Sequence, residues 1–145
     1  MGAAVKLIDL RRIWDQAPHN AFPDLIRFAG RWLCVLREGP SHVSGDGALR
    51  VIASADGARW ETAALIRSPD SDLREARFSV APNGRLIAGV RLHDGGIRTT
   101  LCRIDPETAG LTELLALHDG LLWVSYYSSH EGKTAIYLAT VRTED

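Results

Sequence analysis

The sequence contains few residues of the kinds that mark secretion, metal binding or nucleic-acid binding. Its two cysteines, Cys34 and Cys102, lie in apolar runs without the spacing of metal ligands, so we expect buried, reduced thiols and no metal. Lys6 and Lys133 are the only lysines and the net charge is −1, which leaves no basic face for nucleic acid. No apolar run approaches the ~20 residues of a membrane helix, and no secretory signal opens the chain. We therefore expect a cytoplasmic protein with no cofactor and with neither membrane nor nucleic acid as a partner.

The positive charge that is present comes almost entirely from arginine. A guanidinium group binds a carboxylate through two parallel hydrogen bonds, so a cluster of arginines favours an acidic ligand. The alternative is a codon bias toward arginine, with these side chains forming ordinary surface charge. Both interpretations stay open at this point.

Turn signals divide the 145 residues into a series of hairpins. Gly30, Gly57 and Gly84 recur at equal intervals, and Asp-Gly or Asn-Gly pairs supply the positive φ of tight hairpin turns. The runs between the turns are rich in β-branched and aromatic residues, and helical periodicity is absent, so we predict an all-β chain. The predicted strands are Asp24–Phe28, Arg31–Arg37, Ala48–Ser54, Arg59–Ile66, Ala76–Ala81, Arg85–Leu92, Ile97–Ile104, Leu111–Leu117, Leu121–Ser128 and Lys133–Val141, with Val5–Ile13 as an eleventh.

Pairs of hairpins have about the length of one β-propeller blade. We predict a single domain over residues 1–145 with about three blades of four antiparallel strands. The first spans 24–66 and the second 76–117, while 121–141 and the N-terminal strand 5–13 together close the third. A rearrangement of these strands into another β fold is the alternative.

The stretch SADGARW, residues 54–60, gives this architecture a family resemblance. It resembles the Asp-box of sialidases and related bacterial-neuraminidase-repeat propellers, in a form one residue shorter. In that family the motif lies on the outer hairpin of a blade. The resemblance implies that Ser54, Asp56 and Gly57 hold a tight turn through backbone hydrogen bonds, and that Trp60 packs between blades.

The resemblance extends to residues 19–61 and 71–89, which are similar to opening blades of sialidase-like proteins, and to 120–141, which is similar to their closing blade. A sialidase-type propeller has about six blades, so this chain resembles an internally shortened member. LHDG occurs twice, at 92–95 and 117–120, as internal deletions would leave it. Three blades would expose long strand edges, and a homodimer would complete a six-bladed ring.

The resemblance also implies a pocket. Retaining sialidases hold the substrate carboxylate with three arginines and use a tyrosine nucleophile, with an aspartate as acid/base. On this chain the implied anion clamp is Arg37, Arg74 and Arg91, the nucleophile is Tyr126 or Tyr127, and the acid is Asp24. The other candidate ligand-binding residues are His19, His42 and Glu75.

Departures from the family argue against catalysis. The segment RRIW at 11–14 lacks the proline of the family's Arg-Ile-Pro, and Glu75 stands where the relatives have aspartate. The arginines also fit ordinary ion pairs with nearby carboxylates, and adjacent tyrosines on a strand point to opposite faces. We expect a self-assembling propeller module without activity. The alternatives are a module that binds an acidic sugar and a residual glycoside hydrolase.

Overall fold

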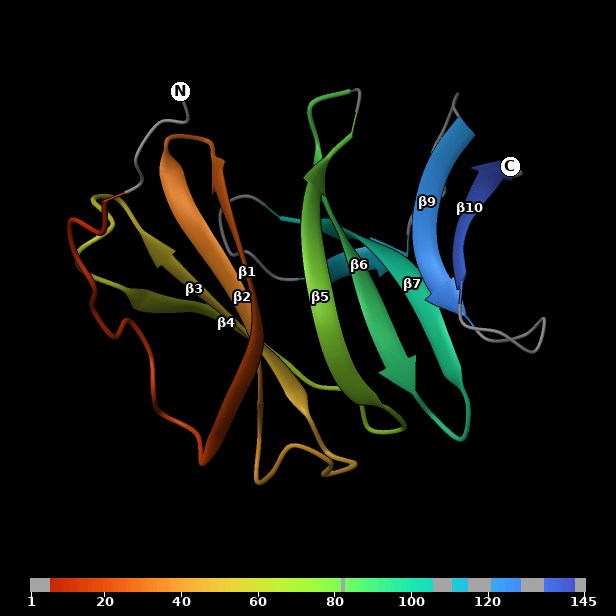
Figure 1. The fold of residues 1–145 in the computed structure, drawn as a ribbon, viewed down its shortest axis with the longest axis horizontal. Helices are drawn as coiled ribbons and strands as arrows, with labels where there is room; N and C mark the ends of the chain where they lie inside the picture. Colours follow the sequence, from red (N-terminus) through yellow and green to blue (C-terminus); the bar gives the residue numbers. More distant parts are fainter. Residues whose placement is uncertain (1–5, 82, 106–110, 115–120, 129–134, 143–145) are drawn as a thin grey trace. The chain divides into compact units, whose positions relative to one another are not determined.

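The computed structural model describes residues 6–81, 83–105, 111–114, 121–128 and 135–142, with side chains at 6–81, 83–96 and 99–105. The described residues form ten β-strands and contain no helix, which confirms the all-β prediction (Figure 1). Within this part of the chain, no segment therefore meets the length and hydropathy that a membrane-crossing helix requires.

The first sheet is an antiparallel meander in which each strand pairs with the next along the chain. Its strands are β1 (His19–Phe28), β2 (Arg31–Gly39), β3 (Ala48–Ser54) and β4 (Glu61–Ile66). The order β1-β2-β3-β4 leaves β1 and β4 at the edges. Tight turns join β1 to β2 and β3 to β4, whereas a longer loop, 40–47, joins β2 to β3.

The second sheet repeats this meander, again with four antiparallel strands in chain order. Its strands are β5 (Asp72–Val80), β6 (Leu86–His93), β7 (Ile97–Ile104) and β8 (Leu111–Leu114). A bulge interrupts the β5–β6 pairing between Arg74 and Arg77, and one interrupts β1–β2 between Ala21 and Asp24. The first strands of the two sheets therefore share the same irregularity.

A third sheet consists of the antiparallel pair β9 (Leu121–Ser128) and β10 (Ala135–Arg142). The chain divides into two compact units, Met1–Leu114 and Leu115–Asp145. The first unit contains both four-stranded sheets and the second contains the hairpin β9–β10.

Every strand predicted between Asp24 and Val141 overlaps an observed strand, and both ends agree for Ala48–Ser54, Ile97–Ile104 and Leu121–Ser128, whereas the other strands differ at one or both ends. The strands β1 and β5 begin several residues before their predicted starts, because each continues through its bulge. The predicted end of the eighth strand at Leu117 lies outside the described residues. The predicted N-terminal strand is wrong over residues 6–13, which form no strand.

The main core lies between the two four-stranded sheets. Alternation along β2 and β3 turns Leu33, Val35, Leu49, Val51 and Ala53 toward the second sheet. The side chains of the second sheet that belong to this core are at most a few per cent exposed: Leu73, Ala76, Leu86, Ala88, Val90, Cys102 and Ile104. Burial raises the pKa of the Cys102 thiol. Alternate residues of β6, namely Leu86, Ala88 and Val90, face this core.

The opposite face of the first sheet has a smaller core of Cys34, Leu36 and Ile52. Ile13, Trp14 and Trp60 pack against it. Burial, followed by the nearby charge of Asp24, raises the pKa of the Cys34 thiol to about 11, so this cysteine is a packing residue in its reduced form.

The contacts of Trp14 explain why the N-terminal segment forms no strand. Its indole Nε1 donates a hydrogen bond of 2.6 Å to Glu38 Oε1, and the Arg50 guanidinium carbon lies 5.3 Å from the indole ring centroid. Arg50 also donates to both oxygens of Glu38, at 3.0 and 2.9 Å. Burial acts to raise the pKa of the Glu38 carboxyl, but hydrogen bonds from Arg50 and Trp14 outweigh it and the net pKa is lowered. A side-chain network therefore anchors this segment, in place of a β ladder.

The substitution Trp14→Phe keeps an aromatic ring on Arg50 but removes the indole N–H that donates to Glu38. We expect the free energy of unfolding to fall by about 1 kcal/mol, because a largely buried carboxylate loses a hydrogen bond. Urea denaturation measures this change, with Leu7→Ala as the control because that side chain is 73% exposed. Equal stability of wild type and Trp14→Phe would contradict the anchor.

Candidate functional site

A buried ion pair joins the two four-stranded sheets where β2 ends and β5 begins. Arg37 donates from Nε and Nη2 to Asp72 Oδ1, at 3.2 and 3.0 Å, and the two side chains are 0% and 2% exposed. Arg37 follows Leu33 and Val35 along one face of β2, so its guanidinium continues the apolar stripe that faces the second sheet. Such a pair is tolerated in a core only when every polar group around it is satisfied.

The loop between β2 and β3 supplies the remaining partners of Arg37. Nη1 donates to the Ser41 carbonyl oxygen at 3.1 Å, and Nη2 donates to the Ser44 carbonyl oxygen and hydroxyl at 2.8 and 3.1 Å. The guanidinium is fully enclosed by these contacts. Arg37 is thus a structural group here, and its donors do not face solvent.

Asp72 is equally saturated. Its Oδ1 also accepts a hydrogen bond of 2.9 Å from the Gly47 amide, and its Oδ2 accepts one from Arg74 Nε. The Leu73 amide donates to the Gly47 carbonyl at 3.1 Å, which ties the loop to β5. Burial acts to raise the pKa of Asp72, but hydrogen bonds from Arg74 and Arg37 and their charges dominate, so the pKa is lowered. The ionised carboxylate thus holds Arg37, Arg74 and the Gly47 amide in place.

Two glycines make room for the pair. A Cβ on Gly47 would overlap Asp72 Oδ1 and Arg37 Nε, and a Cβ on Gly39 would lie 2.8 Å from Ser44 Oγ and 3.0 Å from Arg37 Nη1. The glycines of the segment EGPSHVSGDGAL are therefore required by close approach at these two positions.

Two more arginines lie on the second sheet beside this pair. Arg74 on β5 is the register partner of Arg91 on β6, so their side chains leave the same face of the sheet. Arg91 Nη1 donates to both oxygens of Glu75, at 2.8 and 2.9 Å. Arg74, Arg91 and Glu75 are 16%, 25% and 31% exposed at the side chain, so solvent reaches all three.

The β5 bulge aims Glu75 at Arg91. Glu75 has a φ of +45°, a left-handed conformation that costs a residue with a side chain about 1 kcal/mol or more. Bulges re-aim single side chains and recur next to binding sites. Phe22, in the matching bulge of β1, has a φ of +54°. The strain is therefore a repeated feature of the first strand in each sheet.

His93 completes the group that we name the arginine cluster: Arg37, Asp72, Arg74, Glu75, Arg91 and His93. It is the register partner of Asp72 and closes β6. Its Nε2 atom is buried and has no hydrogen-bond partner among the described residues. Burial lowers the pKa of this imidazole, and the positive charges of Arg74 and Arg91 lower it further. The carboxylates of Asp72 and Glu75 act to raise the pKa but do not outweigh these effects.

His19, Phe22 and His42 form an aromatic group at the start of β1. The His19 and His42 rings meet edge to face, with centroids 5.3 Å apart, and Phe22 lies 5.4 Å from His42. His42 is exposed on the loop, whereas His19 Nε2 and Asn20 Oδ1 are buried without a hydrogen-bond partner in the described structure. Within the described residues, no three potential metal-binding side chains come together.

Asp24 links the first strands of the two sheets. Its Oδ2 accepts a hydrogen bond of 2.7 Å from the Phe78 amide on β5, and Arg77 Nη1 donates to the neighbouring Pro23 carbonyl at 3.0 Å. The structure thus separates Asp24, which joins β1 to β5, from the arginine cluster at the start of β5.

The turn SADGARW is held by its own side chains. Asp56 Oδ1 accepts from the amides of Ala58 and Arg59 at 2.8 and 2.9 Å, and Ser54 Oγ accepts from the Gly57 amide at 2.8 Å. These amides are the main reason that the Asp56 pKa is lowered. Gly57 has a φ of +73°, and Trp60 Nε1 donates to its carbonyl at 3.1 Å.

The structure thus brings Arg37, Arg74, Glu75 and Arg91 into one region. The side chains of Tyr126 and Tyr127 lie outside the described residues, although both positions belong to β9. Sequence reasoning missed His93 and included Asp72 only as one of the nearby carboxylates that could pair with the arginines. One signal was present, since Arg37 and Arg91 each stand two residues before the end of a second strand, and His93 continues the face of Arg91.

Comparison with known proteins adds no relative to this geometry. No family model, no curated protein and no solved structure matches the chain. The chemistry of the arginine cluster is therefore argued from its own contacts.

The Gly47→Ala substitution tests how tightly the Arg37–Asp72 pair is enclosed. The added Cβ must displace Asp72 or the loop, so we expect a loss of about 2–4 kcal/mol in unfolding free energy. Gly45→Ala is the matched control on the same loop, because a Cβ there meets nothing within 4 Å. Thermal and urea unfolding of both variants measure the difference, and similar losses for the two would show that the enclosure is loose.

Proposed function

We propose that this protein is a binding module for a small acidic molecule, an acidic sugar, and that the arginine cluster recognises its carboxylate. The observation that carries the proposal is the pairing of Arg74 with Arg91 across β5 and β6. Like charges directly opposite each other on a sheet are destabilising. A solvent-reached pair of guanidinium groups is suited to an anion that bridges them.

The balance of charge supports the same conclusion. The cluster holds three arginines against the two carboxylates of Asp72 and Glu75, which leaves an excess positive charge. Arg37 is fully enclosed by structural partners, so Arg74 and Arg91 are the arginines that a ligand can reach.

The proposed architecture is that of a shortened sialidase-like propeller. Two consecutive four-stranded meanders, each starting with a bulged strand, support this interpretation, as do the Asp24 hydrogen bond between β1 and β5 and the Asp-box-like turn at 54–60. Binding without hydrolysis fits the position of Asp24, because its oxygen Oδ2 is already occupied by the Phe78 amide.

Titration with N-acetylneuraminate tests the proposal, with its methyl ester as the matched ligand that lacks the charge. We expect saturable binding of the acid and at least about tenfold weaker binding of the ester, because a charge-assisted pair of hydrogen bonds is lost. Arg91→Gln is expected to weaken acid binding about tenfold or more. Arg59→Gln is the control, since that side chain is 93% exposed on the 54–60 turn. Equal binding of acid and ester would overturn the proposal.

A fluorogenic sialoside separates binding from catalysis. We expect no release of the fluorophore, because the proposed site binds the carboxylate and supplies no free acid at Asp24. If the wild type releases the fluorophore and the variant Tyr126→Phe or Tyr127→Phe does not, the protein is a glycoside hydrolase instead.

Homodimerisation that completes a six-bladed ring is a second proposal, and it is compatible with the first. The hairpin β9–β10 favours it, because this sheet has two strands among the described residues whereas the other two sheets have four each. The native mass across a dilution series tests it. A stable dimer is expected, and a monomer at all concentrations would rule out the ring.

A further inference from the structure

A separate pocket lies at the end of β6 opposite to the arginine cluster. Its volume is about 310 Å³, at the lower end of the range for small-molecule sites. It is lined by Phe28, Gly84, Arg85, Leu86, Arg103, Ile104 and Asp105. These residues come from the end of β1, the turn that leads into β6 and the end of β7. The pocket shares no residue with the arginine cluster.

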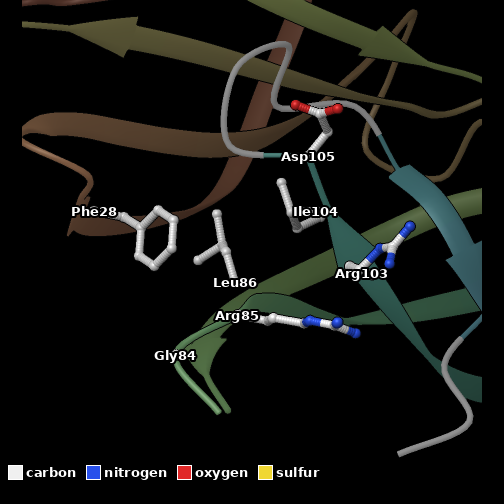
Figure 2. Close-up of a pocket in the computed structure, with 7 residues that line it drawn as sticks. All are labelled: Phe28, Gly84, Arg85, Leu86, Arg103, Ile104 and Asp105. Carbon is white, nitrogen blue, oxygen red and sulfur yellow. The ribbon is translucent and has the colours of Figure 1, made fainter.

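The floor of the pocket is apolar and continuous with the core. Leu86 and Ile104 are 1% and 3% exposed and belong to the core cluster, and Phe28 packs against that cluster. Figure 2 draws these three side chains in a row across the pocket. Because their positions are fixed by the packing between the sheets, the floor is preformed for an apolar group.

The rim of the pocket is charged. The charged side chains that line it are Arg85, Arg103 and Asp105 (Figure 2). Arg85 is exposed, and no carboxylate among the described side chains lies within ion-pair distance of its guanidinium. An exposed guanidinium beside an apolar floor complements an anion that carries an apolar body.

The backbone at Arg85 is held in place. The Ala81 amide donates to the Arg85 carbonyl at 2.9 Å, and the Gly84 amide donates to the Ala81 carbonyl at 2.8 Å. The Arg85 amide donates to Asn83 Oδ1 at 3.1 Å, and Gly84 has a φ of +78°. The turn thus presents Arg85 from a fixed point next to Leu86, which reduces the ordering that ligand binding requires.

We propose that this pocket binds a small amphipathic carboxylate, with its apolar body on Phe28, Leu86 and Ile104 and its carboxylate on Arg85. The ligand class differs from that of the arginine cluster, whose ligand is polar throughout. The two proposals are independent, because the residues involved are at opposite ends of β6.

Titration of the ¹⁵N-labelled protein with hexanoate and with acetate tests this site. Both probes carry the same charge, so only the apolar body differs. Each buried methylene is worth about fourfold in affinity, so we expect hexanoate to bind at least about tenfold more tightly than acetate. The amide signals of Gly84 and Asp105 are expected to shift, and those of Arg91 and His93 to remain unchanged.

Arg85→Gln is the variant, and it is expected to weaken hexanoate binding about tenfold while the thermal stability stays the same, because the side chain is exposed. Arg59→Gln and Arg91→Gln are expected to leave hexanoate binding unchanged. Equal affinities for hexanoate and acetate would overturn the proposal, as would full hexanoate binding by Arg85→Gln. Loss of hexanoate binding in Arg91→Gln would assign the anion to the arginine cluster instead. A failure here leaves the acidic-sugar proposal standing, since that one is measured with N-acetylneuraminate and Arg91.

Discussion

The structure of the first unit depends on a single buried interaction, the ion pair between Arg37 and Asp72. Removing two charges from water is costly, and the cost is offset only where the remaining donors and acceptors are satisfied. The loop between β2 and β3 does this, with serine oxygens for Arg37 and the Gly47 amide for Asp72. The loop can approach this closely because positions 39 and 47 are glycines. This ion pair therefore fixes the loop and the start of β5, and it joins the two sheets beside their apolar core.

The same ion pair positions the groups that we assign to ligand binding. Asp72 accepts from Arg74, so the structural pair and the exposed arginines share one carboxylate. Arg37 and Arg91 occupy matching places in β2 and β6, yet the first is fully buried and the second is a quarter exposed. The difference follows from the loops: a long one encloses Arg37, whereas a short turn follows β6. The two four-stranded sheets thus have an arginine at the same place, which is enclosed in the first sheet and reached by solvent in the second.

The strands could be predicted from the sequence because their signals are local. Turn glycines and the β-branched and aromatic residues between them located all ten strands, including β6. The N-terminal segment was mispredicted because KLIDLRRIW has strand-like composition, while its course is decided by the bond from Trp14 to the distant Glu38. Ion pairing of Arg37 was one interpretation of the sequence, but the burial of its guanidinium and of the His93 Nε2 atom could not be predicted. Burial of an arginine, or of an imidazole nitrogen, depends on which loop covers it, and no local pattern encodes that. The bulge that aims Glu75 at Arg91 is also a property of strand pairing.

A double-mutant cycle on Arg37 and Asp72 tests the central claim most directly, with Arg37→Met, Asp72→Leu and the double variant compared by urea unfolding. If the pair organises the fold, each single variant leaves a buried charge without its partner and loses about 3–5 kcal/mol. The double variant then loses much less than the sum of the two, because no unpaired charge remains. Losses that simply add would contradict the account, since they would show that the two side chains stabilise the protein independently.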